Sequence, residues 1–144
     1  RRINHFMKVY AFAKAIGEEE GIDGKTQNIL EIAAVVHDIG IKLSEEKYNS
    51  AAGNYQEMEG PAEAEKLLSK LGISEDIIKR VSYLVGHHHT YNKIDGLDYQ
   101  ILVEADFIVN LYEENESPSA AKNVMNKIFK TETGKRYIEK MFLQ

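Results

Sequence analysis

The sequence contains no cysteine and no tryptophan, and only two of its 144 residues are proline. The absence of cysteine excludes a disulfide, a thiolate metal site and a cysteine nucleophile. It also fits a reducing compartment, and we expect the protein to be cytoplasmic. No apolar run approaches the ~20 residues that span a bilayer, and no signal-peptide pattern opens the chain, so we expect no membrane association.

Positive charge is also scarce, with 18 Lys and Arg residues against 23 Asp and Glu residues and a net charge of −5 at pH 7. Proteins bind nucleic acid duplexes mainly through Lys and Arg contacts to phosphate, so we expect no long nucleic acid among the partners. A small anionic substrate remains compatible with this balance, because a bound metal ion can supply positive charge locally.

Apolar residues recur at helical spacing along nearly the whole chain, and no segment alternates with a period of two. The sequence therefore predicts an all-α fold with a single domain over residues 1–144, because this length supports one sizeable core and is too short for two. The two prolines, Pro61 and Pro118, are each expected where a helix begins. The predicted helices cover residues 3–16, 29–37, 61–71 and 97–111, another follows Ser74, and two more begin near residues 119 and 131.

One stretch departs from this pattern. Residues 43–60 hold Ser, Asn, Gly and Tyr without a clear period, and the stretch is longer than most connections between helices. Loops of this length are usually functional or disordered, and this one follows a His-Asp pair, so we predict a lid or a pocket wall. Tyr48, Tyr55 and Tyr91 either stack on a base or sugar or anchor the loops, and we favour the second interpretation.

Polar groups that bind metal ions lie on the apolar faces of the first two predicted helices. His5 shares a helical stripe with Val9, and His37 follows Ala33 on the inward side of the second helix. Asp38 comes directly after His37, at the C-terminal end of that helix. Both segments thus bring a histidine into the expected core.

Two later helices show the same feature. His88 continues the stripe of Leu84, and His89 lies slightly around the same face. Asp106 follows Leu102, which places a carboxylate on a buried face. Imidazoles and carboxylates thus face inward from four helices in all.

Each of these residues has an ordinary alternative explanation. A single inward histidine is more often a hydrogen-bonded core residue than a ligand, and an inward aspartate can cap a neighbouring helix. Four helices would each need a separate explanation, however, because burying unpaired imidazoles and carboxylates is costly. We therefore predict a divalent metal ion, with Mn, Fe, Ni and Zn all compatible with nitrogen and oxygen ligands. His87 shares a stripe with Arg80 and Tyr83 and is expected to face outward or line a rim.

The order of these motifs resembles the HD-domain superfamily of metal-dependent phosphohydrolases. The matching segments cover roughly the first 112 residues and read RRINHFMKVYAFA, AAVVHDIGIK, LVGHHHTY and LVEADFIVNL. The resemblance implies a compact helical bundle with the metal site at its centre, to which residues 119–144 add further helices. No Gly-Tyr-Pro follows the histidine run, so the branch that cleaves cyclic di-guanylate is not assigned.

The resemblance also implies a ligand set for one or two metal ions. The first metal would be held by His5, His37, Asp38 and Asp106, and the second by His88 and His89. Asp38 would bridge the two ions. Members that bind two metal ions commonly have a further histidine at the position of Glu59 in this chain. A glutamate carboxylate can itself ligate a metal. The sequence is therefore compatible with either one or two bound metal ions.

The implied reaction is hydrolysis of a small phosphate ester or nucleotide by metal-activated water. A metal held by His and Asp lowers the pKa of bound water from ~16 towards ~7, so no side-chain nucleophile is needed. Asp38 is expected both to ligate the metal and to orient the water. Lys42 either contacts the phosphate or is a solvated surface lysine, and the second interpretation is favoured.

Two other functions stay open at this stage. Some proteins with the same bundle resemble diiron oxygenases, and a regulatory module could bind metal or nucleotide without turnover. Glu59 mildly favours the regulatory module, whereas the intact His37-Asp38 pair and Asp106 argue against it. The C-terminal helices could also support a homodimer.

Overall fold

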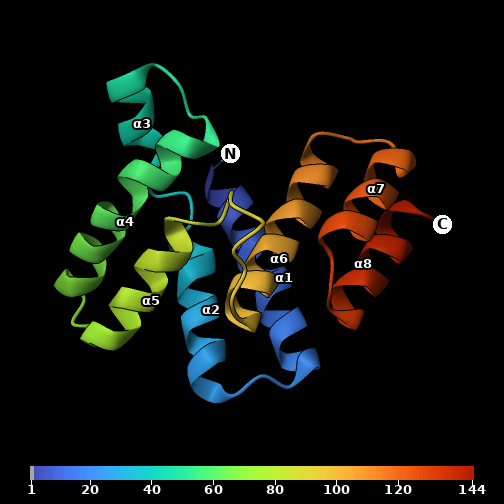
Figure 1. Cartoon of the computed structure of the whole chain (residues 1–144), viewed down its shortest axis with the longest axis horizontal. Coiled ribbons are helices and arrows are strands. Elements are labelled where there is room, and N and C mark those ends of the chain that lie inside the picture. Colours follow the sequence, from blue (N-terminus) through green and yellow to red (C-terminus); the bar gives the residue numbers. More distant parts are fainter. Residues whose placement is uncertain (1) are drawn as a thin grey trace.

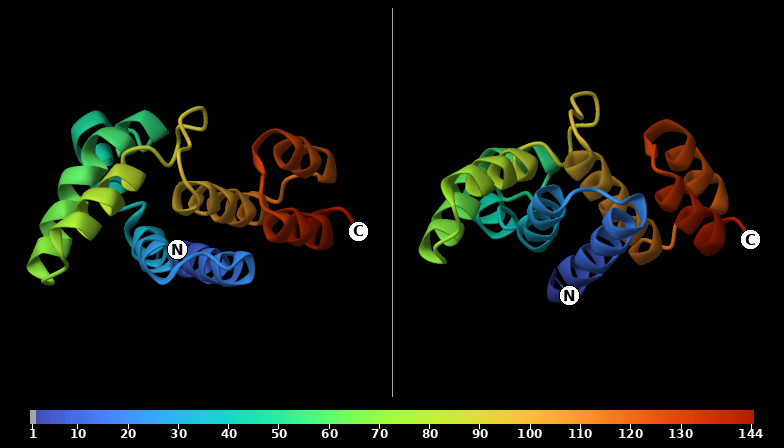
Figure 2. Two further views of the ribbon diagram at one scale, coloured as in Figure 1. Left: turned by 60° about the horizontal axis from the view of Figure 1, so that its bottom comes forward. Right: turned by 90° about the horizontal axis from the view of Figure 1, so that it is seen from below.

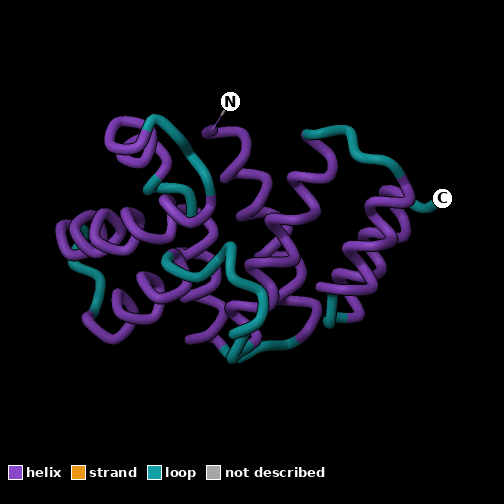
Figure 3. Tube along the Cα trace, turned by 45° about the horizontal axis from the view of Figure 1, so that its top comes forward, coloured by secondary structure: helices purple, strands orange, loops and turns teal. Residues whose placement is uncertain are grey.

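The computed structural model describes residues 2–144, and every regular element in this range is an α-helix (Figures 1 and 3). The all-α prediction is therefore confirmed. No helix in this range has both the length and the apolar character needed to cross a membrane. The helices are α1 (Arg2–Glu20), α2 (Gly24–Val36), α3 (Ile41–Tyr48), α4 (Gly53–Lys70), α5 (Glu75–Val85), α6 (Leu97–Glu113), α7 (Pro118–Ile128) and α8 (Glu132–Phe142).

Helices α1, α2 and α6 pack together in the middle of the molecule (Figures 1 and 2). On one side, α4 and α5 form a pair that packs on α2, with α3 against α4. On the other side, α7 and α8 form a second pair that packs on α6 and α1. Helix α6 is the most enclosed, since nearly every residue from Asp98 to Leu111 is buried. A polar side chain on its inward face must therefore find a partner inside the protein.

Short polar side chains define where three of the helices begin. The side chains of Asp23, Ser117 and Thr131 each accept a hydrogen bond from a backbone N–H in the first turn of α2, α7 and α8. Such N-caps stabilise a helix by about 1 kcal/mol each. Pro118 lies in the first turn of α7, as predicted.

The prediction of a long loop over residues 43–60 is wrong. Helices α3 and α4 cover this stretch except for the four residues 49–52. The helical period is hidden in the sequence because the buried positions are Ser44, Gln56 and Gly60 rather than large apolar residues. Small and polar residues of this kind allow helices to pack closely, but they carry no apolar signal.

Pro61 also lies elsewhere than predicted. Helix α4 begins at Gly53, so the proline lies inside the helix rather than in its first turn. A proline in a helix interior removes one backbone hydrogen bond and costs ~3 kcal/mol. Packing of α4 against α3 and α5 offsets this cost, so tertiary contacts override the local signal.

A buried carboxylate ties α6 to the connection between α7 and α8. Glu104 is fully buried, and its Oε2 accepts hydrogen bonds from the backbone N–H groups of Lys130 at 2.9 Å and Thr131 at 3.1 Å. The same oxygen accepts a hydrogen bond from Gln100 Nε2 at 2.6 Å. Glu104 Oε1 accepts a hydrogen bond from Thr131 Oγ1 at 2.6 Å. This network holds the C-terminal pair of helices against α6.

Candidate metal centre

Three parts of the chain bring four of the predicted ligands into one cluster. Helix α1 supplies His5, the turn after α2 supplies His37 and Asp38, and α6 supplies Asp106. The Nε2 atom of His5 lies 3.2 Å from Asp38 Oδ2 and 3.2 Å from Asp106 Oδ1. The Nε2 atom of His37 lies 3.3 Å from each of these oxygens. Ligand atoms about 2.1 Å from one ion lie about 3.0–3.4 Å from one another, so this spacing fits a bound metal ion.

The two most buried histidines each direct Nε2 into the cluster. His37 donates its Nδ1–H to the backbone oxygen of Ala34 at 2.7 Å, and His88 donates its Nδ1–H to that of Val85 at 2.7 Å. Because a carbonyl oxygen only accepts, Nδ1 carries a proton, and in the neutral ring the lone pair is therefore on Nε2. Both Nε2 atoms are buried and form no hydrogen bond within residues 2–144. Buried polar atoms are rarely left without a partner, and a metal ion would supply one for each.

A second group of residues shares Asp38 with the first. Ligand atoms of Asp38, His88 and His89 lie within 4.8 Å of one another, as do those of His5, His37 and Asp38. Asp38 Oδ2 faces His5 and His37, whereas Asp38 Oδ1 lies 3.7 Å from His88 Nε2. One carboxylate therefore presents an oxygen to each group, as a ligand that bridges two metal ions would.

The charges in the cluster favour a cation. Burial lowers the pKa of His37, but the carboxylates of Asp38 and Asp106 outweigh it and raise the pKa to about 9. Burial raises the pKa of Asp106, but the facing rings of His37 and His5 outweigh it and bring the pKa well below its ordinary value. In His89, burial and the neighbouring histidine lower the pKa to about 4, so this ring is neutral at pH 7 and keeps a lone pair.

A pocket of about 450 Å³ opens over the cluster, so the predicted ligands can be reached from solvent. Its lining includes His5, Asp38, His89 and Asp106 and, beyond them, Gln56 and Asn110. The pocket thus combines metal-ligating side chains with neutral amides that can hydrogen-bond to a bound molecule.

Comparison with known families agrees with this arrangement. A family model described as the HD domain matches residues 2–124. The chain belongs to the HD domain family. The crystal structure of a predicted HD superfamily hydrolase from an uncultured Thermotogales bacterium is similar, with a TM-score of 0.67 and 26% sequence identity, covering 96% of this chain and 71% of that chain. The comparison with curated proteins gave no match. The resemblance of the motifs to the HD superfamily is therefore confirmed.

Glu59 and Lys42, which were predicted to act at the metal site, lie apart from the cluster of metal-ligating residues. Glu59 is in neither ligand group, because its carboxylate contacts Lys47 Nζ at 3.0 Å and accepts a hydrogen bond from Tyr48 Oη at 2.6 Å. Lys42 is exposed on α3 and does not line the pocket over the cluster. Their roles as ligand and phosphate contact stay predictions.

The aromatic residues near the HD motifs contact one another rather than the cluster. The rings of Tyr48 and Tyr55 stack with their centroids 4.2 Å apart, and Tyr91 packs against Phe107 at 5.1 Å. These contacts favour the interpretation that they anchor the connections. His87 stacks on the Tyr83 ring, one turn earlier in the chain, and belongs to neither ligand group.

Three side chains hold the histidines of the metal cluster in place. His5 Nδ1 lies 2.8 Å from Glu113 Oε1, and His89 Nε2 donates to Gln56 Oε1 at 3.1 Å. Glu57 Oε2 accepts the backbone N–H of His89 at 3.0 Å. Glu113 follows Asp106 by seven residues, and this spacing could have placed it on the same face of α6 but could not have shown its contact with His5. Gln56 was missed because it lies in the stretch expected to be a loop.

The surroundings of Glu113 lower the pKa of its carboxyl group. Burial raises its pKa, but the hydrogen bond from His5 and the nearby ammonium group of Lys8 outweigh it and leave the pKa below its ordinary value. Glu113 is therefore ionised at neutral pH. An ionised carboxylate is a stronger hydrogen-bond acceptor than a neutral group, so the contact with His5 is charge-assisted.

Proposed function

We propose that this HD domain is a metal-dependent phosphohydrolase that acts on a small phosphate ester or nucleotide. The observation that carries the proposal is Asp38, whose two oxygens face separate groups of histidines beneath an open pocket. Such a carboxylate suits the one- or two-metal centres that hydrolyse phosphate esters. The similarity to a predicted HD superfamily hydrolase supports the same assignment.

The clustered residues would bind one or two metal ions. His5, His37 and Asp106 would hold a first metal and His88 and His89 a second, with Asp38 common to both. A bound divalent metal supplies a water of lowered pKa and neutralises charge on a phosphoryl oxygen. Asp38 would also orient that water by accepting a hydrogen bond from it. This arrangement does not depend on Glu59 or Lys42.

The pocket suits a small molecule. Its volume of about 450 Å³ lies within the range of roughly 300–1,000 Å³ that is typical of small-molecule sites. Glu113 and Glu114 add negative charge to the wall of this pocket. Arg2 also lines the pocket and forms an ion pair with Glu45 at 2.5 Å. An anionic substrate would therefore depend on the metal and on Arg2 for charge neutralisation.

Metal content and phosphate release test the proposal together. Untagged protein purified without chelator should contain one or two equivalents of a divalent metal by elemental analysis. It should release phosphate from members of a panel of nucleotides and phosphate esters, with activity lost on chelation and restored by Mn or Fe. Oxygen consumption without phosphate release would favour a diiron oxygenase. Absence of metal after soaking with excess Mn or Fe would favour a regulatory module.

His88→Ala should lower the metal content far more than His87→Ala. The His88 side chain is buried and its Nε2 faces Asp38 at 3.7 Å, whereas His87 stacks on Tyr83 outside both ligand groups. In a two-metal centre, loss of His88 should remove about one equivalent of metal, because a site with too few ligands binds weakly. Elemental analysis of both variants purified in parallel measures the difference. Equal losses would contradict the assignment of His88 as the inward residue.

A further inference from the structure

The three histidines whose Nε2 atoms face Asp38 find partners for Nδ1 in two different ways. His37 and His88 follow the C-terminal ends of α2 and α5, where the last carbonyl oxygens of a helix lack an intrahelical donor. Both histidines donate Nδ1–H to such an oxygen at 2.7 Å. His5 instead lies in the first turn of α1, where carbonyl oxygens already accept from the N–H groups of the helix. His5 therefore needs an acceptor from another element.

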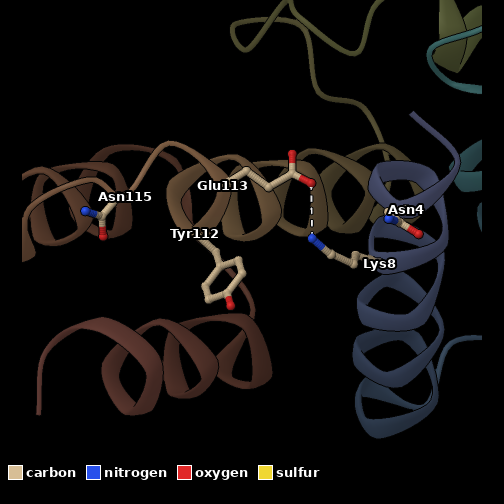
Figure 4. Close-up of a pocket in the computed structure, with 5 residues that line it drawn as sticks. All are labelled: Asn4, Lys8, Tyr112, Glu113 and Asn115. Atoms are coloured by element: carbon tan, nitrogen blue, oxygen red, sulfur yellow. Dashed lines mark hydrogen bonds and ion pairs between the residues drawn. The ribbon is translucent and has the colours of Figure 1, made fainter. Parts of the chain in front are cut away.

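Glu113, in the last turn of α6, provides this acceptor. Its Oε1 lies 2.8 Å from His5 Nδ1, while the Nε2 atom of the same ring lies 3.2 Å from both Asp38 and Asp106. Glu113 Oε2 accepts a hydrogen bond from Lys8 Nζ at 3.3 Å, across the space between α6 and α1 (Figure 4). Lys8 follows His5 by three residues, on the same side of α1. Two contacts to one helix thus fix the rotation of the carboxylate.

We infer that Glu113 is a positioning residue for the metal centre, because it accepts the Nδ1–H of His5 and so keeps the Nε2 lone pair directed at Asp38 and Asp106. The inference rests on the proposed function, since it requires a metal at this cluster. The role is specific to His5. The corresponding acceptors of the other two histidines are backbone oxygens, which no substitution removes, whereas the acceptor of His5 is a side chain that can be replaced.

The position of Glu113 lets it act on a metal through His5. Glu113 lines the pocket over the cluster and also an outer hollow of about 530 Å³, together with Asn4, Lys8, Tyr112 and Asn115 (Figure 4). It therefore forms part of the wall between the two. Its Oε1 is directed at the far side of the His5 ring from the cluster, so its effect on a metal passes through His5.

Zn²⁺ affinity tests the inference, measured on metal-free protein in competition with a chromophoric chelator. Glu113→Ala should weaken Zn²⁺ binding by about 10- to 100-fold, as is usual when the group behind a metal-ligating histidine is removed. Glu113→Gln keeps an acceptor oxygen but loses the charge, so it should weaken binding less. Glu116→Ala is the matched control, because Glu116 is exposed beyond the end of α6 and should leave the affinity unchanged.

A second measurement separates positioning from a general structural role. In ¹⁵N-labelled, Zn²⁺-loaded protein, a hydrogen-bonded Nδ1–H of His5 should be observed in the wild type and lost to exchange with water in Glu113→Ala, with little change in thermal unfolding. Wild-type Zn²⁺ affinity in Glu113→Ala would overturn the inference and leave the proposed function intact. Zn²⁺ binding that depends on Glu113, without any hydrolysis, would overturn the proposed function alone. No Zn²⁺ binding in the wild type would overturn both.

Discussion

Asp38→Ala should remove most of the bound metal and abolish phosphate release. Asp38 is the residue that the two ligand groups share, and each of its oxygens faces a different group. Loss of a group behind a metal ligand costs about 10- to 100-fold in metal affinity, so loss of a ligand common to both groups should cost more than about 100-fold. Elemental analysis and the rate of phosphate release, measured on one preparation, report the two effects.

Two further variants make the Asp38 result specific. Asp38→Asn keeps the shape of the side chain but replaces one oxygen by an amide nitrogen that has no lone pair to offer a metal, so the bridging role should be lost. Asp76→Ala is the matched control, because Asp76 lies at the start of α5 and pairs with Lys25 at 2.6 Å on the exposed surface. It should retain metal and activity. Undiminished turnover in Asp38→Ala would rule out the proposed site.

The inward direction of the metal-facing residues follows from helical spacing alone. Val9 and Leu102 are fully buried, and His5 and Asp106 lie one turn away from them along α1 and α6. Because an α-helix repeats every 3.6 residues, an apolar stripe fixes the direction of a polar residue within it. For this reason the sequence was sufficient to predict that these side chains face inward, whereas α3 and the start of α4 were missed.

The contacts that orient these residues could not be read from the chain in the same way. The contact between His5 and Glu113 joins positions 108 apart, and that between Gln56 and His89 joins positions 33 apart. Periodicity indicates that a side chain faces inward but does not indicate which distant residue it meets. The start of α4 was also missed, because Gln56 is buried at a position where an apolar residue would have revealed the helix.

Glu104→Ala should lower the free energy of unfolding by about 3 kcal/mol or more, because several buried neutral donors lose their acceptor at once. The substitution removes the acceptor of the backbone N–H groups of Lys130 and Thr131 and of the side chains of Gln100 and Thr131. Each buried donor left without an acceptor costs about 1–3 kcal/mol. Urea denaturation of metal-free protein measures the change without the contribution of a bound metal to stability.

Comparison with two other variants separates hydrogen bonding at Glu104 from packing. Glu104→Gln keeps the size of the side chain but turns an amide NH₂ towards donors, so it should also destabilise, by less than Glu104→Ala. Glu65→Ala changes an exposed residue of α4 and should alter the stability by less than about 0.5 kcal/mol. A loss below about 1 kcal/mol in Glu104→Ala would mean that water replaces the carboxylate. The burial of Phe129 and Ile138, rather than the carboxylate, would then hold α7 and α8 against α6.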